Sequence, residues 1–127
     1  MNPYDVAHNL AKALRESSEF KEMKEAQAAM KTDDTGKKML LDFRAEQVKM
    51  YKQQLSGIEP SAEEKKKIEN LYEVINMNVL IKRLLDAEYK VSTLLHDIQK
   101  IISEANDEIY DEELIQLPEE EAGDEKV

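Results

Sequence analysis

The chain has 127 residues, and its 28 Asp and Glu against 18 Lys and Arg give a formal net charge of −10. It contains no cysteine, which excludes disulfide bonds, zinc–thiolate sites and cysteine-ligated iron–sulfur clusters within the chain. The length predicts one domain. Abundant Leu, Ile, Met, Ala, Lys, Glu and Gln, interrupted by only three Gly and three Pro, predict an all-α fold.

The net charge is concentrated at the C-terminal end. Residues 103–127 contain 11 acidic residues and a single base, Lys126, whereas residues 1–102 contain 17 residues of each sign. We therefore predict a helical domain at 1–106 and an acidic C-terminal tail at 107–127, which we expect to be disordered or loosely docked. A body without excess positive charge predicts no direct binding to nucleic acid.

Hydropathy and charge predict the location of the protein. No apolar run approaches the roughly 18–20 residues of a transmembrane helix. The first residues lack the basic and apolar regions of a signal peptide. A helix that lies on a membrane usually carries a basic polar face, whereas acids and bases are mixed along this body. We therefore expect a soluble cytoplasmic protein with no membrane association.

The first two predicted helices have clear start signals. Asn2 followed by Pro3 supplies a side-chain cap and a proline at the first helical position. Ser17 or Ser18 can cap a second segment, whose helical spacing extends to a capping and turn cluster at residues 32–36.

The third and fourth predicted helices are separated by a stop signal and a start signal. The third covers about 35–56, and Gly57 is placed to terminate it. Ser61 and Glu64 have capping-box spacing and start the fourth. The apolar positions of these two helices are Leu40, Phe43 and Met50, with Met39, Val48, Tyr51 and Leu55 beside them, and then Ile68, Leu71 and Ile75.

The strongest pattern in the chain is an apolar stripe near its C-terminal end. The phase of the apolar positions jumps at residues 76–78, which predicts a break capped by Asn76 or Asn78. Beyond it, a spacing of 3-4-3-4 averages 3.5 residues, which is typical of helices packed nearly parallel or antiparallel. The pattern covers 29 residues, about 43 Å of helix. The stripe consists of Met77, Leu80, Leu84, Ala87, Val91, Leu94, Ile98, Ile101 and Ala105.

This stripe predicts the architecture. A helix of that length needs long partners, from its own chain or from another copy. We therefore predict an elongated antiparallel helical bundle with a long C-terminal helix, self-associating as a homodimer or a higher oligomer, and we assign the stripe to the core and the self-association face.

No group of residues predicts catalysis or a bound cofactor. Asp5 and His8 have the i, i+3 spacing of some carboxylate–histidine metal ligands, but that chemistry needs a second such pair and two further carboxylates. His96 has Thr93 at the equivalent position. Scattered serines are explained by capping, and three separated glycines cannot form a phosphate loop. We therefore expect no enzymatic activity, no metal and no cofactor.

Several short stretches between residues 4 and 102 form a recognisable series. They are Leu10-Ala11-Lys12-Ala13-Leu14, Ser17-Ser18-Glu19-Phe20-Lys21, Leu40-Leu41-Asp42-Phe43, Gly57-Ile58-Glu59-Pro60-Ser61, and Asn78-Val79-Leu80-Ile81-Lys82 leading to Leu94-Leu95. In these stretches the chain resembles the YheA/YlbF/YmcA-like family of small helical proteins from Gram-positive bacteria, and it is most similar to the YheA branch.

The resemblance implies an all-α homo-oligomer, most simply a dimer. It also implies kinship with the YlbF and YmcA branches, which act in a complex that adjusts the endoribonuclease controlling mRNA turnover. Their cysteine-held iron–sulfur clusters do not carry over, because this chain has no cysteine.

Three functional hypotheses follow from the sequence. The first is a non-enzymatic helical oligomer that acts as a protein–protein interaction module. The second is a regulatory adaptor in RNA turnover and development, with partners among the proteins of RNA metabolism. The third is a sensor of a small ligand or a metal.

Overall fold

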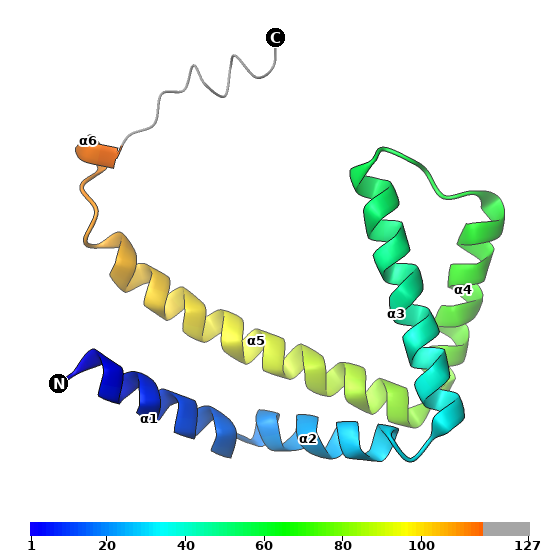
Figure 1. The fold of residues 1–127 in the computed structure, drawn as a ribbon, viewed down its shortest axis with the longest axis horizontal. Coiled ribbons are helices and arrows are strands. Elements are labelled where there is room, and N and C mark those ends of the chain that lie inside the picture. Colours follow the sequence, from blue (N-terminus) through cyan, green and yellow to red (C-terminus); the bar gives the residue numbers. More distant parts are fainter. Residues whose placement is uncertain (116–127) are drawn as a thin grey trace, which may run out of the picture. The chain divides into compact units, whose positions relative to one another are not determined.

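The computed structural model describes residues 1–115, and this part of the chain contains six α-helices and no strand. The all-α prediction is confirmed. The chain divides into two compact units, residues 1–92 and residues 93–127. The helices are α1 (Pro3–Glu16), α2 (Ser18–Met30), α3 (Asp34–Leu55), α4 (Ala62–Met77), α5 (Val79–Asp107) and α6 (Glu112–Ile115) (Figure 1).

Polar side chains start the first two helices, as the sequence predicts. The Asn2 side chain accepts a hydrogen bond from the backbone N–H of Tyr4, and Pro3 occupies the first helical position of α1. Ser17 lies between α1 and α2. It donates its hydroxyl proton to the Leu14 carbonyl at 2.6 Å and accepts from the N–H of Phe20 at 3.2 Å. One serine thus ends α1 and begins α2.

The third helix ends in a glycine turn. Gly57 has φ +73°, a left-handed conformation that a residue without a Cβ adopts easily. Its N–H donates to the Gln54 carbonyl at 3.2 Å, and the N–H of Ile58 donates to the Gln53 carbonyl at 2.8 Å. This pair of bonds is a Schellman motif, and it satisfies two carbonyls that the end of α3 leaves open. The prediction that Gly57 terminates the helix is confirmed.

Capping residues also define both ends of α4. The Ser61 side chain accepts from the N–H of Glu64 at 3.2 Å and starts the helix. At the other end, Asn78 is extended, with ψ 112°, and its Oδ1 accepts from the N–H of Ile81 at 3.0 Å. The break predicted at residues 76–78 is confirmed, with Asn78 as the cap, because this residue leaves the helical conformation and caps the first turn of α5.

The core of the first unit draws on four helices. In Figure 1, α3 and α4 run side by side in opposite directions, as the two arms of a helical hairpin. The rings of Phe43 on α3 and Tyr72 on α4 meet edge to face with their centroids 5.1 Å apart. The buried side chains, none more than 5% exposed, are Ala26 and Met30 on α2, Leu40 and Phe43 on α3, Ile75 on α4, and Ile81, Leu84 and Ala87 on α5.

The second unit consists of the remainder of α5 and the short helix α6. Every side chain from Ile101 to Ile115 is exposed. The boundary predicted between a helical domain at 1–106 and a tail at 107–127 lies next to Asp107, the last residue of α5. The boundary stays a prediction, and the part of the tail at 116–127 lies outside the described residues.

Candidate interaction surface

The stripe found in the sequence differs in burial from one end to the other. Leu84 and Ala87 are buried in the core, and Leu80 packs against it. Val91, Leu94 and Ile98 are half-buried, whereas Ile101 is 66% exposed and Ala105 is also exposed. Met77 is the last residue of α4 and is 85% exposed, so the part of the stripe on α5 begins at Leu80.

This gradient gives the stripe two parts. The first part, up to Ala87, helps to hold the first unit together. The second part keeps the same helical spacing but leaves its last apolar side chains in contact with water. Ile102, next to the stripe, is 50% exposed and widens the uncovered surface. An apolar helix face that continues beyond the core is typical of a surface that packs against another protein.

A second uncovered apolar row lies on α3. Leu41, Val48, Tyr51 and Leu55 are 54–70% exposed and share one face of this helix. Together with Arg44 they repeat the 3-4-3-4 spacing of the stripe on α5. From the sequence, Val48, Tyr51 and Leu55 are expected beside the main row of α3 and have no predicted role. Arg44 interrupts the apolar residues of this row, so the row is hard to recognise from the sequence.

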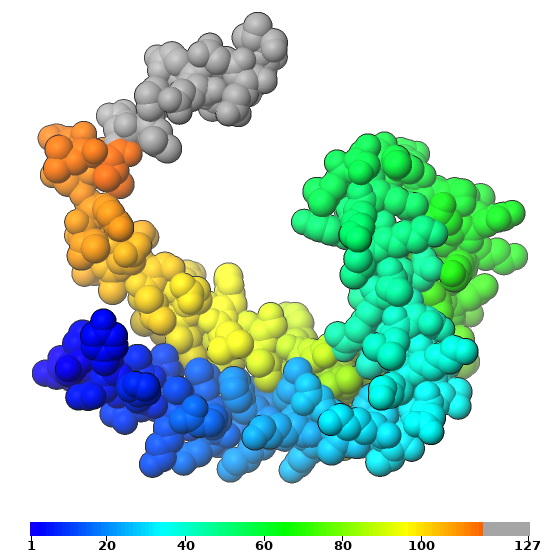
Figure 2. All heavy atoms as spheres, in the orientation of Figure 1, coloured from blue at the N-terminus to red at the C-terminus, as the bar shows by residue number. Residues whose placement is uncertain are grey.

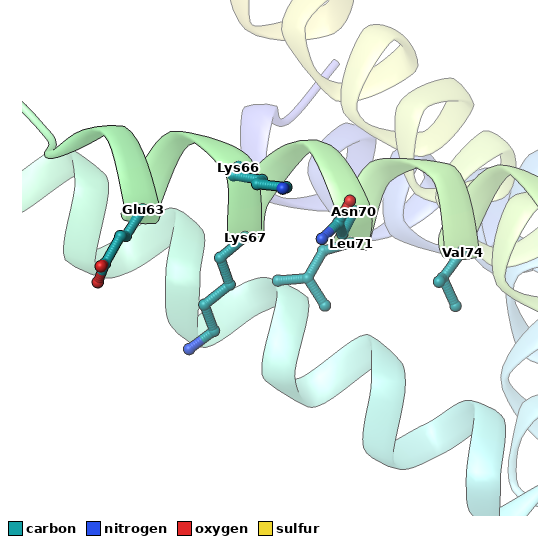
Figure 3. A pocket seen from close by; sticks show the side chains of 6 residues that line it. All are labelled: Glu63, Lys66, Lys67, Asn70, Leu71 and Val74. Atoms are coloured by element: carbon teal, nitrogen blue, oxygen red, sulfur yellow. The ribbon is translucent and has the colours of Figure 1, made fainter.

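A shallow apolar groove runs along α4. It encloses about 380 Å³, and its lining residues all belong to this helix: Glu63, Lys66, Lys67, Asn70, Leu71 and Val74. Figure 3 shows Lys67 and Leu71 pointing towards α3. Val74 is 41% exposed, and Leu71 packs against the core. Figure 2 shows the atoms of α3 and α4 next to each other, and both helices, with this groove and the α3 row, belong to the first unit.

Ion pairs join the helices around the core. The Nε of Arg83 on α5 donates to Glu22 of α2 at 2.7 Å, and its Nη2 lies 3.5 Å from Glu25. The Arg83 hydrogen bond holds the pKa of Glu22 below its ordinary value, although burial acts in the opposite direction. Arg44 on α3 pairs with Glu88 on α5 at 2.6 Å. These contacts fix the start of α5 against both α2 and α3.

A second group of polar contacts joins α3 and α4. Lys67 donates to Glu46 at 2.7 Å, which raises the pKa of the lysine. The Gln53 side-chain amide donates to Glu64 at 3.0 Å, and this bond lowers the pKa of the carboxyl group. All these groups lie on paired helix surfaces rather than in a common cleft. Their pKa shifts are explained by the ion pairs and hydrogen bonds that hold the helices together.

The residues considered for chemistry stay apart in the structure. His8 lies on α1, His96 lies on α5, and both are exposed. Within residues 1–115, no three His, Asp or Glu side chains are grouped so that they could hold a metal ion. None of the helices described here is long and apolar enough to cross a membrane. The features that remain are apolar helix faces and grooves between charged side chains.

Comparison with known proteins identifies the family of this chain. A family model described as control of competence regulator ComK, YlbF/YmcA, matches residues 4–105. The chain belongs to this family. A UPF0342 protein of Halothermothrix orenii is 42% identical over 99 residues, which are 78% of this chain and 84% of the relative. A UPF0342 protein of Alkalihalophilus pseudofirmus is 39% identical over 109 residues, 86% and 92% of the two chains.

Two solved structures have the same fold. The yheA protein from Bacillus subtilis has a TM-score of 0.61 and 27% identity, covering 87% of this chain and all of the other. A protein of unknown function (DUF964) from Bacillus stearothermophilus has a TM-score of 0.70 and 23% identity, covering 84% and 93%. The predicted resemblance to the YheA/YlbF/YmcA-like family is confirmed. The matched residues include nearly all of α5 and therefore the whole stripe.

Proposed function

We propose that this member of the YlbF/YmcA family is a non-enzymatic helical oligomer, most simply a homodimer, that acts as a protein–protein interaction module. One observation carries the proposal. The stripe on α5 keeps its 3-4 spacing beyond Ala87, the last of its fully buried residues, and its final two residues are Ile101, which is 66% exposed, and Ala105, which is also exposed. A packing pattern without packing partners at one end supports a partner from another chain.

A second copy is the partner that the pattern favours. Spacing that averages 3.5 residues suits a helix of similar length and similar pattern, and a copy of α5 supplies both. A symmetric pair is also the commonest arrangement of soluble homo-oligomers, because one self-complementary face is enough to build it. The α3 row of Leu41, Val48, Tyr51 and Leu55 then remains for a different protein or a further copy.

The test places a charge on the stripe. In Leu94→Asp/Ile98→Asp, two half-buried apolar positions become acidic. We expect the oligomer to dissociate, because burying an unpaired carboxylate in an apolar interface costs several kcal/mol. Light scattering after size-exclusion chromatography measures the mass. Circular dichroism checks that the helices remain.

The matched control carries the same added charge on another face of α5. His96→Asp/Ser103→Asp replaces two exposed polar residues on the same helix. We expect this variant to keep the mass of the unmodified protein. An oligomer that survives the stripe substitutions with its helices intact contradicts the proposed role of the stripe.

A regulatory role is the second candidate, and the family description supports it. The matching family model is described by its control of the competence regulator ComK. In this proposal the helical oligomer binds other proteins and changes their activity, and an adaptor in RNA turnover is one form of it. Deletion of the gene should then alter transcript ends, as mapped across the transcriptome. Unchanged transcript ends would remove the RNA-turnover form of the proposal.

A further inference from the structure

One groove of the first unit combines an apolar floor with a cationic rim. It lies among α2, α3 and α5 and encloses about 460 Å³. Its floor includes Met30, Leu40 and Leu84, which are at most 5% exposed. The full lining is Gln27, Met30, Lys31, Lys37, Leu40, Leu41, Arg44, Leu84 and Glu88. A groove of this kind accepts a bulky aliphatic side chain while its rim contacts polar groups.

The rim carries a net positive charge. Glu88 is the only acidic residue in the lining, and it pairs with Arg44 at 2.6 Å. Lys31 and Lys37 are exposed, and neither forms an ion pair with any residue in the described part of the chain. Two cations are therefore available to a ligand. This rim favours an acidic ligand, and the floor favours one with apolar side chains.

The chain itself contains a segment with both properties. Residues 111–121 read Asp-Glu-Glu-Leu-Ile-Gln-Leu-Pro-Glu-Glu-Glu, which places three aliphatic side chains between two groups of three acids with no base among them. In the part of the segment that the structure describes, Leu114 is 83% exposed and Ile115 is 53% exposed. Large apolar side chains left in water within a highly acidic segment are typical of a short peptide that binds a partner.

We propose that the groove lined by Lys31, Lys37 and Leu84 binds the acidic segment 111–121 of a second copy of the chain. An aliphatic side chain of the segment enters the apolar floor, and the flanking carboxylates contact the two lysines. The cationic rim and apolar floor of the groove match the acids and aliphatic side chains of the segment, and a pair of copies supplies each of these two surfaces twice. This inference goes beyond the proposed function, because the stripe on α5 can hold a dimer together while the groove stays empty.

Photo-crosslinking between two isotopic forms of the full chain tests the proposal. The change Ile115→p-benzoylphenylalanine is made in chains grown on ¹⁵N, and these are mixed with unmodified ¹⁴N chains. After irradiation, mass spectrometry identifies the crosslinked peptides. We expect mixed ¹⁵N–¹⁴N products that join position 115 to the peptides containing Met30 or Leu40. We also expect the yield to fall as the salt concentration rises, because screening weakens exposed ion pairs.

A charge reversal links the crosslink to the rim. Lys31→Glu/Lys37→Glu is made in the ¹⁴N chains, which lack p-benzoylphenylalanine. It should lower the yield of ¹⁵N–¹⁴N crosslinks by about fivefold, which is the size expected for losing two exposed ion pairs. Lys65→Glu/Lys66→Glu makes the same change in charge on α4 and should leave the yield unchanged. The crosslink yield tests whether the groove binds the segment, and the mass of the Leu94→Asp/Ile98→Asp variant tests whether the stripe holds the oligomer together. The two proposals can therefore fail separately.

Three outcomes would overturn the proposal. The first is crosslinking confined to chains of the same isotope, which would place the segment on its own chain. The second is crosslinking to other surfaces, or no crosslinking at all. The third is a mixed product whose yield does not respond to the charge reversal at Lys31 and Lys37.

Discussion

Truncation of Ile101 should weaken self-association without weakening the fold. Ile101→Ala removes three carbons, worth about 2.4 kcal/mol if all are withdrawn from water at about 0.8 kcal/mol per carbon. The side chain is 66% exposed in the single chain, so a partner can cover about two thirds of it, or about 1.6 kcal/mol. A symmetric dimer contains the site twice, and the loss is then about 3 kcal/mol.

That loss corresponds to a dissociation constant raised by roughly two orders of magnitude, since each 1.4 kcal/mol is about tenfold. Sedimentation velocity over a dilution series measures the constant. Ser103→Ala, which removes no apolar surface from the same stretch of α5, serves as the control and should leave it unchanged.

The stability of the single chain should hardly change in Ile101→Ala. The residue is largely in water, and alanine favours a helix slightly more than isoleucine does. Urea unfolding at a concentration where both proteins are monomeric should therefore agree to within about 0.5 kcal/mol. A dissociation constant within twofold of the unmodified protein would refute the reasoning, because it would place Ile101 outside the interface.

Three further predictions concern the first unit. Ile81→Ala, at a side chain with no exposed surface, should lower the free energy of unfolding by about 2–5 kcal/mol in a chemical denaturation experiment, and a loss below about 1 kcal/mol would contradict its place in the core. Gly36→Ala should lower the melting temperature despite the better helix propensity of alanine, because the new Cβ would displace the Asp33 carboxylate, which caps α3 by accepting from the Gly36 N–H at 2.9 Å; calorimetry that shows a rise would contradict this. Arg83→Gln should destabilise the protein most above pH 4.5, which is the ordinary pKa of Glu22. Because Arg83 lowers the pKa of Glu22 in the folded chain, the pair stabilises the fold above pH 4.5, and this stability is lost as the pH falls through the lowered pKa. An equal loss in the free energy of unfolding by urea at pH 7 and at pH 3 would contradict the pairing.

The helix boundaries could be predicted from the sequence because they depend on local chemistry. Asn2, Ser17 and Asn78 each cap a helix through a side-chain oxygen, and Gly57 adopts the left-handed turn that ends α3. These interactions involve residues at most five positions apart, so a single short stretch of sequence contains all the information.

The distribution of burial along a helix could not be predicted in this way. Periodicity identifies which residues share a face, but it does not reveal where along that face another helix covers them. Leu84 and Ile101 look equivalent in the stripe, yet their exposed fractions are 5% and 66%.

The groove on α2, α3 and α5 was also beyond the reach of the sequence. Two residues of its rim, Lys31 and Lys37, lie close together in the sequence, whereas Leu84 lies far along the chain. The sequence shows the concentration of acidic residues at 111–121. It does not show a site for the aliphatic residues of this segment, because the proposed groove is formed by three helices that come together only in the fold.

The central claim is that the uncovered end of the α5 stripe is covered by a second copy. Sedimentation equilibrium of the unmodified chain, over a wide range of concentrations, tests this most directly. We expect an average mass that rises with concentration to twice the mass of the chain, and a value that stays at the chain mass when Leu94 and Ile98 are replaced by Asp. A mass equal to one chain at every concentration, for the unmodified protein, would contradict the account.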